Sequence, residues 1–279
     1  MPLDEPMPPD ESVSSSKAAS SDSTVHADIQ NQEREFHDEH YRKLAEKGHF
    51  REVQDEGLDL WHEHCASLMG DLDGKRILDC GTGDGSMSLW LARQGALVDS
   101  FDISLEAIRL ASGRAKTAGL DSRIRFVQCS FEDLPYENHT FDSAFGSLIL
   151  HHVDLVLASK ELGRILKPGA RGVFSENFAF NPFLNFARNH LIGRFGIPRL
   201  GTLTEQPLGS EQIEIVRRHL GVDLEWPAVL FFQILDRQVF KYKYRFINRL
   251  CRVLDLMIFQ IVPLRRFSYR GTMVLTPRG

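Results

Sequence analysis

The segment LDCGTGDG, residues 78–85, constrains the fold of this chain more than any other. It follows directly on the short apolar run 76–80 and precedes a helical pattern over 86–94. Gly81 and Gly83 allow the backbone to turn tightly and to come close to a ligand. The first N–H groups of the following helix would remain free for an anionic group. The segment therefore predicts a strand, a ligand-binding turn and a helix in immediate succession.

The same alternation of strand and helix continues on the C-terminal side of this turn. Further apolar runs over 96–102, 124–128, 141–147 and 170–177 are separated by helical patterns, two of which begin at the capping residues Ser104 and Asp154. Such alternation is typical of a doubly wound, Rossmann-like α/β sheet. Runs at 222–226 and 268–276 predict a sixth and a seventh strand, the C-terminal one antiparallel. Right-handed crossovers would bring the strand carboxyl ends, and hence the ligand, to one edge.

The remaining segments suggest the domain organisation. Residues 1–30 are rich in Ser, Pro, Asp and Glu and hold few large apolar residues, which predicts a disordered leader. Residues 31–279 then form one domain, introduced by helices over 31–47 and 56–70, with a cofactor-binding core over 75–177. The irregular, Pro-containing segment 178–221 and an amphipathic segment 236–262 are expected to be inserted pieces that form a helical cap over the ligand edge.

Charge and cysteine spacing exclude several classes of protein. A net charge of −5 does not favour nucleic-acid binding, and no partner of that kind is expected. No secretory signal is recognisable, and the apolar stretch 253–264 has 12 residues where a membrane span needs about 20. A cytoplasmic location is expected. The four cysteines are too widely spaced to predict a metal site or a disulfide framework.

Asp102 closes the second predicted strand, where an acid would accept hydrogen bonds from both hydroxyls of a ribose. A nicotinamide-dependent oxidoreductase has a similar layout and is the first alternative. Its fingerprint requires a third glycine at the position that Ser86 occupies here.

Four motifs in order resemble the class I S-adenosylmethionine-dependent methyltransferases. These motifs are DCGTGDG, FDIS (101–104), FEDLPYENHTFDSAFGSLILHHV (131–153) and ELGRILKPGA (161–170). The resemblance covers about residues 75–177 and is nearest to the small-molecule branch that contains the ubiquinone and menaquinone methyltransferases. It implies that S-adenosylmethionine is the cofactor.

The resemblance also implies roles for individual residues around the methionine and the ribose. Asp79 and the backbone of Gly81, Thr82 and Gly83 would hold the methionine amino and carboxylate groups. Asp102 would bind the ribose.

The adenine and the open side of the cofactor involve a second set of residues. Ile103 would pack on the adenine, whereas Ser130 and the Phe131 backbone would read its edge. The family usually has Asp at the position of Ser130, so this contact would be weaker here. Ser147 would line the methionine end, and Tyr41, together with His37, would form a lid over the cofactor. A plain surface helix is the alternative for these last two residues.

The chemistry of the class does not dictate one catalytic residue, because a sulfonium methyl group is already activated for displacement. The protein supplies alignment and, for some acceptors, a base. His152 and His151 follow the fourth strand at the ligand edge and are candidate bases, although they could equally line the pocket. Glu176 and Asn177 end the fifth strand and are candidate acceptor contacts.

Five basic residues recur at spacings of four, four, four and three within 236–262, between apolar residues: Arg237, Lys241, Arg245, Arg249 and Arg252. On one helix they would form a single stripe beside an apolar face. Such a helix would suit an anionic membrane surface or an amphiphilic substrate. The alternative is a helix packed on the core, paired with the acidic N-terminal region.

The sequence therefore predicts methyl transfer from S-adenosylmethionine to O, N or C of a small acceptor, and the apolar cap favours a lipophilic one. A second alternative is a non-catalytic protein that binds S-adenosylmethionine or associates with membranes. The sequence indicates neither the acceptor nor the oligomeric state.

Overall fold

A computed structural model describes residues 12–48, 58–190 and 206–278, with side chains from residue 28 onward. Its centre is a seven-stranded sheet with the strand order β3-β2-β1-β4-β5-β7-β6. The strands are β1 (Arg76–Cys80), β2 (Leu97–Asp102), β3 (Ile124–Gln128), β4 (Phe141–Ser147), β5 (Leu166–Asn177), β6 (Leu220–Glu225) and β7 (Arg270–Pro277). This arrangement confirms the predicted seven-stranded, Rossmann-like α/β fold.

The directions of the strands separate the sheet into two parts. Strands β1 to β5 are parallel to one another, and β7 runs antiparallel to both β5 and β6. The order of the strands reverses between β1 and β4. Ligands bind at such a switch point in open α/β sheets, outside the carboxyl ends of the strands.

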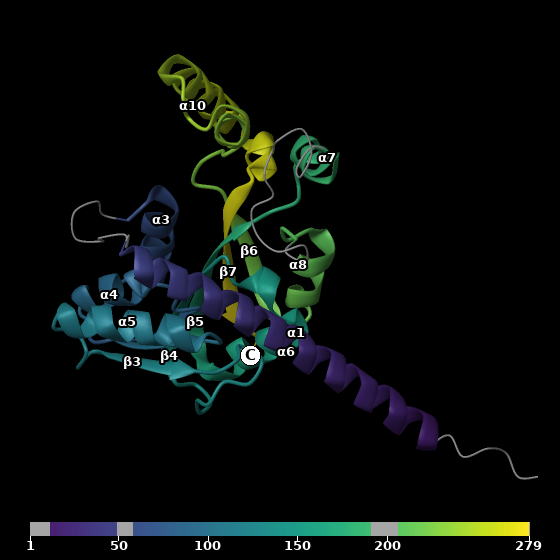
Figure 1. Ribbon diagram of the computed structural model, residues 1–279. Coiled ribbons are helices and arrows are strands. Elements are labelled where there is room, and N and C mark those ends of the chain that lie inside the picture. The colour runs from purple at the N-terminus through teal and green to yellow at the C-terminus, as the bar shows by residue number, and fades with distance from the viewer. Residues whose placement is uncertain (1–11, 49–57, 191–205, 279) are drawn as a thin grey trace, which may run out of the picture.

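Helices cover both faces of the sheet (Figure 1). The helices α3 (Leu60–Met69), α4 (Ser86–Arg93) and α5 (Leu105–Thr117) lie on one face, and α6 (Leu155–Ile165) and α8 (Ser210–Arg217) on the other. Neighbouring residues of β1 serve the two faces: Ile77 packs in the apolar group under α4, whereas Leu78 packs in the group under α6. The predicted caps are confirmed, since Ser104 accepts a hydrogen bond from the N–H of Ala107 and Asp154 accepts two.

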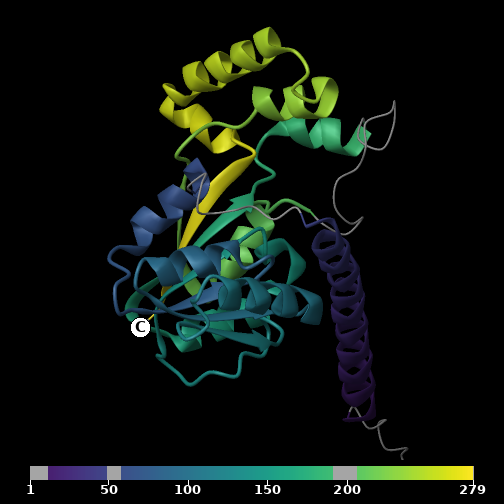
Figure 2. The same ribbon diagram turned by 60° about the vertical axis from the view of Figure 1, so that its left-hand side comes forward.

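The N-terminal segment is the clearest difference from the sequence prediction. Residues 12–30, predicted to be disordered, belong to helix α1 (Ser12–Lys47), which extends past the edge of the core in both views (Figures 1 and 2). Low apolar content led to the prediction of disorder, but the segment from Ser12 to Lys47 contains no Pro or Gly to interrupt a helix. Residues 1–11, the rest of the predicted leader, lie outside the described residues.

A helical cap lies at one end of the sheet, joined to it by the long strand β7 (Figure 2). It comprises α7 (Pro182–His190), α9 (Phe232–Leu235), the π-helical turn η2 (Asp236–Phe240), α10 (Arg245–Phe259) and the 3-10 helix η3 (Val262–Phe267). The single helix predicted for 236–262 is wrong. The helix is interrupted at Lys241 and Tyr242, which adopt left-handed backbone angles with φ of 53° and 58°. The predicted stripe of five bases is therefore divided, and only Arg245, Arg249 and Arg252 share α10.

The cap is also smaller than the sequence predicts at its N-terminal side. Helix α8 falls in the segment 178–221 that was expected to be cap, but it packs against α6 and β6 as part of the sheet's own helical layer. Its residues Ile213 and Val216 are buried in the main apolar core. Residues 191–205, which the prediction also assigned to the cap, lie outside the described residues.

Across the described ranges, the structure contains no helix long and apolar enough to cross a membrane.

Candidate functional site

A cavity of about 700 Å³, partly open to solvent, lies at the carboxyl ends of β1 to β4 and is covered by α1. This is the edge at which the sequence predicts the ligand. Most of the predicted cofactor residues line it: Tyr41, Gly81, Asp102, Ile103, Ser130, Phe131 and Ser147. Several other residues, which the sequence does not predict as part of the site, also line it: Gln30, Glu33, Glu132, Leu148 and Ile149.

The glycine-rich turn brings bare backbone to the wall of this cavity. Gly81 has φ of 78°, and a side chain there would have its Cβ 2.7 Å from the Ile149 Cδ1 atom. A Cβ on Gly83, which has φ of 55°, would lie 3.2 Å from the Tyr41 hydroxyl oxygen. Thr82 is buried, and its hydroxyl lies 2.6 Å from that of Ser100. The turn thus needs glycine both for its backbone angles and for the space beside it.

Asp79 lies beneath the turn and outside the lining of the cavity. It is 1% exposed, and its carboxylate accepts hydrogen bonds from the hydroxyls of Ser88 and Ser100. Burial raises the pKa of Asp79 to about 7, although both hydroxyls act to lower it. Its predicted contact with the methionine group of the cofactor stays a prediction, because the structure engages this carboxylate from within the protein.

Asp102 lies at the edge of the cavity and orders the turn. One of its oxygens accepts a hydrogen bond from the Gly83 N–H at 3.0 Å, and the other accepts one from the Ser104 N–H at 2.9 Å. Burial raises the pKa of Asp102, and these two hydrogen bonds oppose the shift. A carboxylate oxygen can accept more than one hydrogen bond, so Asp102 retains acceptor capacity for a ligand.

The next strand end contributes Ser130, Phe131 and Glu132. The Ser130 hydroxyl donates to the Glu132 carboxylate, and the Gln30 side-chain amide donates to both residues. A carboxylate therefore stands two residues after the position where the family usually has Asp. Gln30 belongs to the segment predicted to be disordered, so no signal in the sequence pointed to it.

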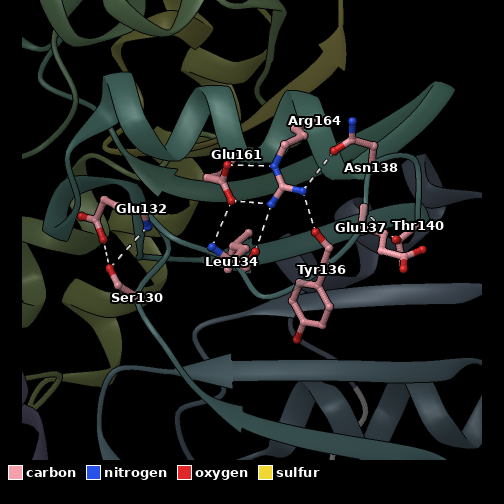
Figure 3. A network of polar contacts seen from close by, with 9 residues as sticks. All are labelled: Ser130, Glu132, Leu134, Tyr136, Glu137, Asn138, Thr140, Glu161 and Arg164. Carbon is pink, nitrogen blue, oxygen red and sulfur yellow. Dashed lines mark hydrogen bonds and ion pairs between the residues drawn. The ribbon is translucent and has the colours of Figure 1, made fainter.

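Residues of α6 hold the loop that carries these side chains (Figure 3). The Arg164 guanidinium donates to the backbone carbonyls of Leu134 and Tyr136 and to the Glu161 carboxylate. Glu161 in turn accepts a hydrogen bond from the Leu134 N–H at 3.0 Å. The motif ELGR thus has a structural role: it fixes the loop that follows Ser130, Phe131 and Glu132.

Helix α1 closes the cavity with polar side chains. Glu33 Oε2 lies 3.1 Å from His152 Nδ1 and 3.4 Å from His37 Nε2, and these two hydrogen bonds lower the pKa of Glu33 to about 2. One ligand atom from each of the three residues lies within 4.8 Å of the others, a spacing that would also suit a metal ion, which the sequence does not predict. Asp38 anchors the helix, since its carboxylate accepts a hydrogen bond from the Ser104 hydroxyl at 2.6 Å.

His151 and Glu176 form a second pair behind the cavity. His151 Nδ1 lies 3.0 Å from Glu176 Oε2, and the other oxygen of Glu176 accepts hydrogen bonds from the N–H groups of Ile149 and Leu150. Glu176 is fully buried, and its carboxylate is engaged by His151 and by the two N–H groups. Its predicted contact with an acceptor stays a prediction.

A second cavity, of about 980 Å³ and partly open to solvent, adjoins the first beneath the cap. Leu148 and His152 line both cavities, whereas His151 and Asn177 line only the second. Leu148 has φ of 56°, an unusual backbone conformation for leucine that holds it at the boundary between the two spaces. The two cavities therefore meet at Leu148 and His152.

Comparison with known proteins identifies the core. Residues 78–174 match the family model described as a methyltransferase domain. The chain is 30% identical over 154 residues to a demethylmenaquinone methyltransferase of Porphyromonas gingivalis, covering 50% of this chain and 62% of that protein. It is 26% identical over 168 residues to a sterol 4-C-methyltransferase of Caenorhabditis elegans, covering 58% and 50% respectively. The chain thus spans less than two thirds of the length of these relatives.

Solved structures agree on the fold. A SAM-dependent methyltransferase from Aquifex aeolicus superposes with a TM-score of 0.54 at 15% identity, covering 86% of this chain and 98% of that one. Residues 78–174 thus match a methyltransferase domain, and the fold agrees with that of a solved SAM-dependent methyltransferase.

Proposed function

We propose that this chain transfers the methyl group of S-adenosylmethionine to O, N or C of a small lipophilic acceptor. The observation that carries the proposal is the junction of the two cavities at Leu148 and His152, next to the glycine-rich turn. The named relatives act on demethylmenaquinone and on a sterol, both of which are apolar molecules.

The residues of the first cavity fit the cofactor. The backbone of Gly81 lines this cavity and would face the methionine end, and Asp102 has acceptor capacity for the ribose hydroxyls. Ile103 and Phe131 offer apolar surface to the adenine, and Ser130 with Glu132 would read its exocyclic amine. Bound there, S-adenosylmethionine would supply an activated methyl group.

Other residues would complete the cofactor site from below and above. Asp79 supports the turn through its hydroxyl partners, and Thr82 joins the same buried group. Ser147 lines the cavity at the methionine end, while Tyr41 and His37 cover it from α1. Exclusion of water by this lid would favour in-line displacement by the acceptor.

We propose His152 as the proton acceptor for an acceptor hydroxyl or carbon acid, because it lines both cavities. Its Nδ1 lies beside the Glu33 carboxylate, which favours the tautomer with the proton on Nδ1 and leaves Nε2 able to accept a proton. The His151 ring lies 4.2 Å from that of His152, and Glu176 orients it in the same manner. His151 would be the alternative base for an acceptor seated deeper in the second cavity.

Calorimetry with S-adenosylhomocysteine tests the cofactor site. Asp102→Ala should weaken binding by about 1–3 kcal/mol, because ribose hydroxyls would lose their acceptor. Asp121→Ala, at an exposed turn, is the matched control and should bind normally. Unchanged affinity in Asp102→Ala would remove the ribose assignment, and tighter binding of NADH than of S-adenosylhomocysteine would overturn the class of reaction.

Release of S-adenosylhomocysteine in the presence of demethylmenaquinol as the probe acceptor separates an enzyme from a protein that only binds the cofactor. His152→Gln should lower the rate about 10²-fold or more if it acts as a base. His40→Gln, on the exposed side of α1, should leave it unchanged. Equal rates for both variants would reduce His152 to a residue that lines the pocket.

We further propose that the cap contacts an anionic membrane and so reaches a lipophilic acceptor. On α10 an apolar stripe faces solvent, namely Phe246, Leu250, Val253 and Met257. Exposed apolar residues in one continuous group mark an interaction surface. Arg245, Arg249 and Arg252 flank the stripe and are exposed, which suits an anionic lipid surface.

Co-sedimentation with liposomes tests this contact. The variant with Arg245, Arg249 and Arg252 changed to Gln should lose binding to anionic vesicles, since each base near the surface contributes about 1 kcal/mol. A matched variant changes three exposed bases of the core helices, Arg93, Lys116 and Lys160, and should bind as the wild type does. Equal sedimentation of both variants, or none by the wild type, would leave α10 as a packed cap.

A further inference from the structure

The second cavity gathers basic side chains from segments far apart in the sequence. Arg188 comes from α7, Arg237 from η2 and Arg270 from β7, and all three line the cavity beneath the cap. Asn177, Gln206 and Tyr269 add further polar groups to the wall. The fold therefore concentrates hydrogen-bond donors at a place that the cofactor does not need.

The charge of the cavity has one sign. Among the described residues that line it, none carries a carboxylate. Guanidinium groups repel one another, and bringing several of them to one wall costs free energy unless anions compensate. Asp59, 3.8 Å from Arg270, supplies part of this compensation from outside the lining. Arginine is also the residue best suited to phosphate, because its planar group donates several hydrogen bonds in a fixed geometry.

Arg270 and Arg237 differ in how they are held. Arg270 donates hydrogen bonds to the Ser175 hydroxyl at 2.8 Å and to the Ser147 hydroxyl at 3.3 Å, and it lies 3.8 Å from Asp59. It is therefore a fixed charge on the floor of the cavity. Arg237 is exposed on the cap side and forms no ion pair or hydrogen bond with any other described side chain. A fixed cation below and an open one above suit an anion that enters between them.

We propose that this cavity binds a phosphate group of the acceptor, so that the substrate class is a phosphorylated, lipophilic molecule. The inference rests on the proposed methyl transfer. With its phosphate between Arg237 and Arg270, the acceptor would extend toward Leu148 and His152, where the cavity meets the cofactor site. The phosphate could belong to a membrane lipid or to a soluble phosphate ester, which share this chemistry.

Hexyl phosphate is a suitable probe, because it carries the phosphate and a short apolar chain. Calorimetry is carried out on the full chain saturated with S-adenosylhomocysteine. The affinity for hexyl phosphate should be at least ten-fold higher than the affinity for hexanol or hexyltrimethylammonium. Arg237→Gln should weaken hexyl phosphate at least ten-fold. Arg93→Gln removes the same charge from the exposed face of α4, outside the cavity lining, and should leave the affinity unchanged.

Several outcomes would overturn the inference. Equal affinity for the phosphate and the alcohol, or equal weakening in Arg237→Gln and Arg93→Gln, would show general attraction and no site. Weaker binding of S-adenosylhomocysteine itself in Arg237→Gln would assign the charge to the cofactor. If the wild type does not bind S-adenosylhomocysteine at all, the proposed methyl transfer is wrong, and the phosphate inference fails with it. This result differs from failure of the phosphate site alone, in which S-adenosylhomocysteine still binds.

The two sources of phosphate are separated by competition. Hexyl phosphate that displaces the chain from vesicles of phosphatidylcholine and phosphatidic acid would identify a lipid headgroup as the ligand. Hexyl phosphate that binds without displacing the chain would identify a soluble phosphate ester. Both results support a phosphate site in the cavity.

Discussion

The sheet core and the helical cap differ in how far their apolar side chains are exposed to solvent. In the core, both faces of the sheet are covered, and large residues such as Phe101 and Phe145 are buried beneath the helices. In the cap, Phe246 is 78% exposed and Phe183 is 74% exposed. The core obtains its stability from burial, whereas the cap leaves apolar surface available for a partner.

A buried acid stands at the centre of each region, and the two are satisfied differently. Asp79 in the core accepts hydrogen bonds from two hydroxyls and lies near the Asp102 and Asp84 carboxylates, so its charge is poorly compensated. Asp255 in the cap, 2% exposed, accepts hydrogen bonds from the N–H groups of residues 231–233, at the start of α9. The buried charge of Asp79 therefore destabilises the fold when the carboxylate is ionised, whereas Asp255 links α10 to the start of α9.

The largest expected effect concerns the core acid. The folded pKa of Asp79, about 7, lies above its ordinary value of 3.8, so the folded state retains a proton that the unfolded state has lost. The free energy of unfolding should therefore fall as the pH rises from about 4 to 7, by at most about 4 kcal/mol at 1.4 kcal/mol per pKa unit. Asp79→Asn has no charge to bury and should remove this part of the pH dependence.

Urea unfolding of both proteins between pH 4.5 and 8 checks this expectation. The variant should gain stability over the wild type as the pH rises, with the difference complete above pH 7. Parallel curves would show that Asp79 is ionised in the fold at a normal pKa. Asp255→Asn provides the comparison in the cap, where the N–H donors at the start of α9 would lose a carboxylate partner.

Gly85 tests how tightly the core is packed. It has φ of 80°, and a Cβ there would lie 2.7 Å from the Cβ of Ala111 on α5. Gly85→Ala should cost about 2–4 kcal/mol, from the left-handed backbone and from overpacking. Gly113 lies on α5 itself and has open space beside it, so Gly113→Ala should stabilise the protein by about 0.5–1 kcal/mol. Denaturation midpoints that move in the same direction would contradict the close packing of the turn on α5.

Asp255 tests whether the cap is a separate cooperative unit. Asp255→Ala should destabilise the cap by about 1–3 kcal/mol, because buried N–H groups would lose their acceptor. Hydrogen exchange should accelerate in α9 and α10 while the affinity for S-adenosylhomocysteine stays unchanged. Asp223→Ala, exposed on β6, is the control. Faster exchange in β1 and α4 as well would show that the core and cap unfold together.

The same division separates what the sequence predicts well from what it does not. Strands such as 76–80 and 124–128 have the bounds that the sequence predicts, because their apolar runs end at glycines or polar turns. The residues of the glycine-rich turn and of the next strand ends follow from their order along the chain. Local pattern is sufficient where packing and periodicity agree.

Long-range contacts could not be predicted in this way. Gln30 and Glu33 reach the cavity because α1 packs across α5, and nothing in their own segment indicates a buried partner. The prediction of one cap helix is wrong at Lys241, where a left-handed backbone conformation interrupts the helix. The basic residues keep helical spacing across this interruption, so their pattern does not reveal it. The arginines of the second cavity come from three segments, and only the folded chain brings them together.

The smallest expected effect compares one strained residue from each region. Leu148 in the core and Lys241 in the cap both adopt left-handed angles, with φ of 56° and 53°. A change to glycine relieves the backbone strain but adds freedom to the unfolded chain, so the free energy of unfolding of each variant should differ from that of the wild type by less than about 1 kcal/mol.

The two variants should differ in function, because Leu148 separates the cavities and Lys241 lies away from them. Leu148→Gly should lower the rate of S-adenosylhomocysteine release with demethylmenaquinol while Lys241→Gly leaves it unchanged, as a coupled turnover assay would measure. A loss of more than about 2 kcal/mol in Leu148→Gly would instead show that the leucine side chain packs as part of the core, and the boundary between the cavities would then be structural and not functional.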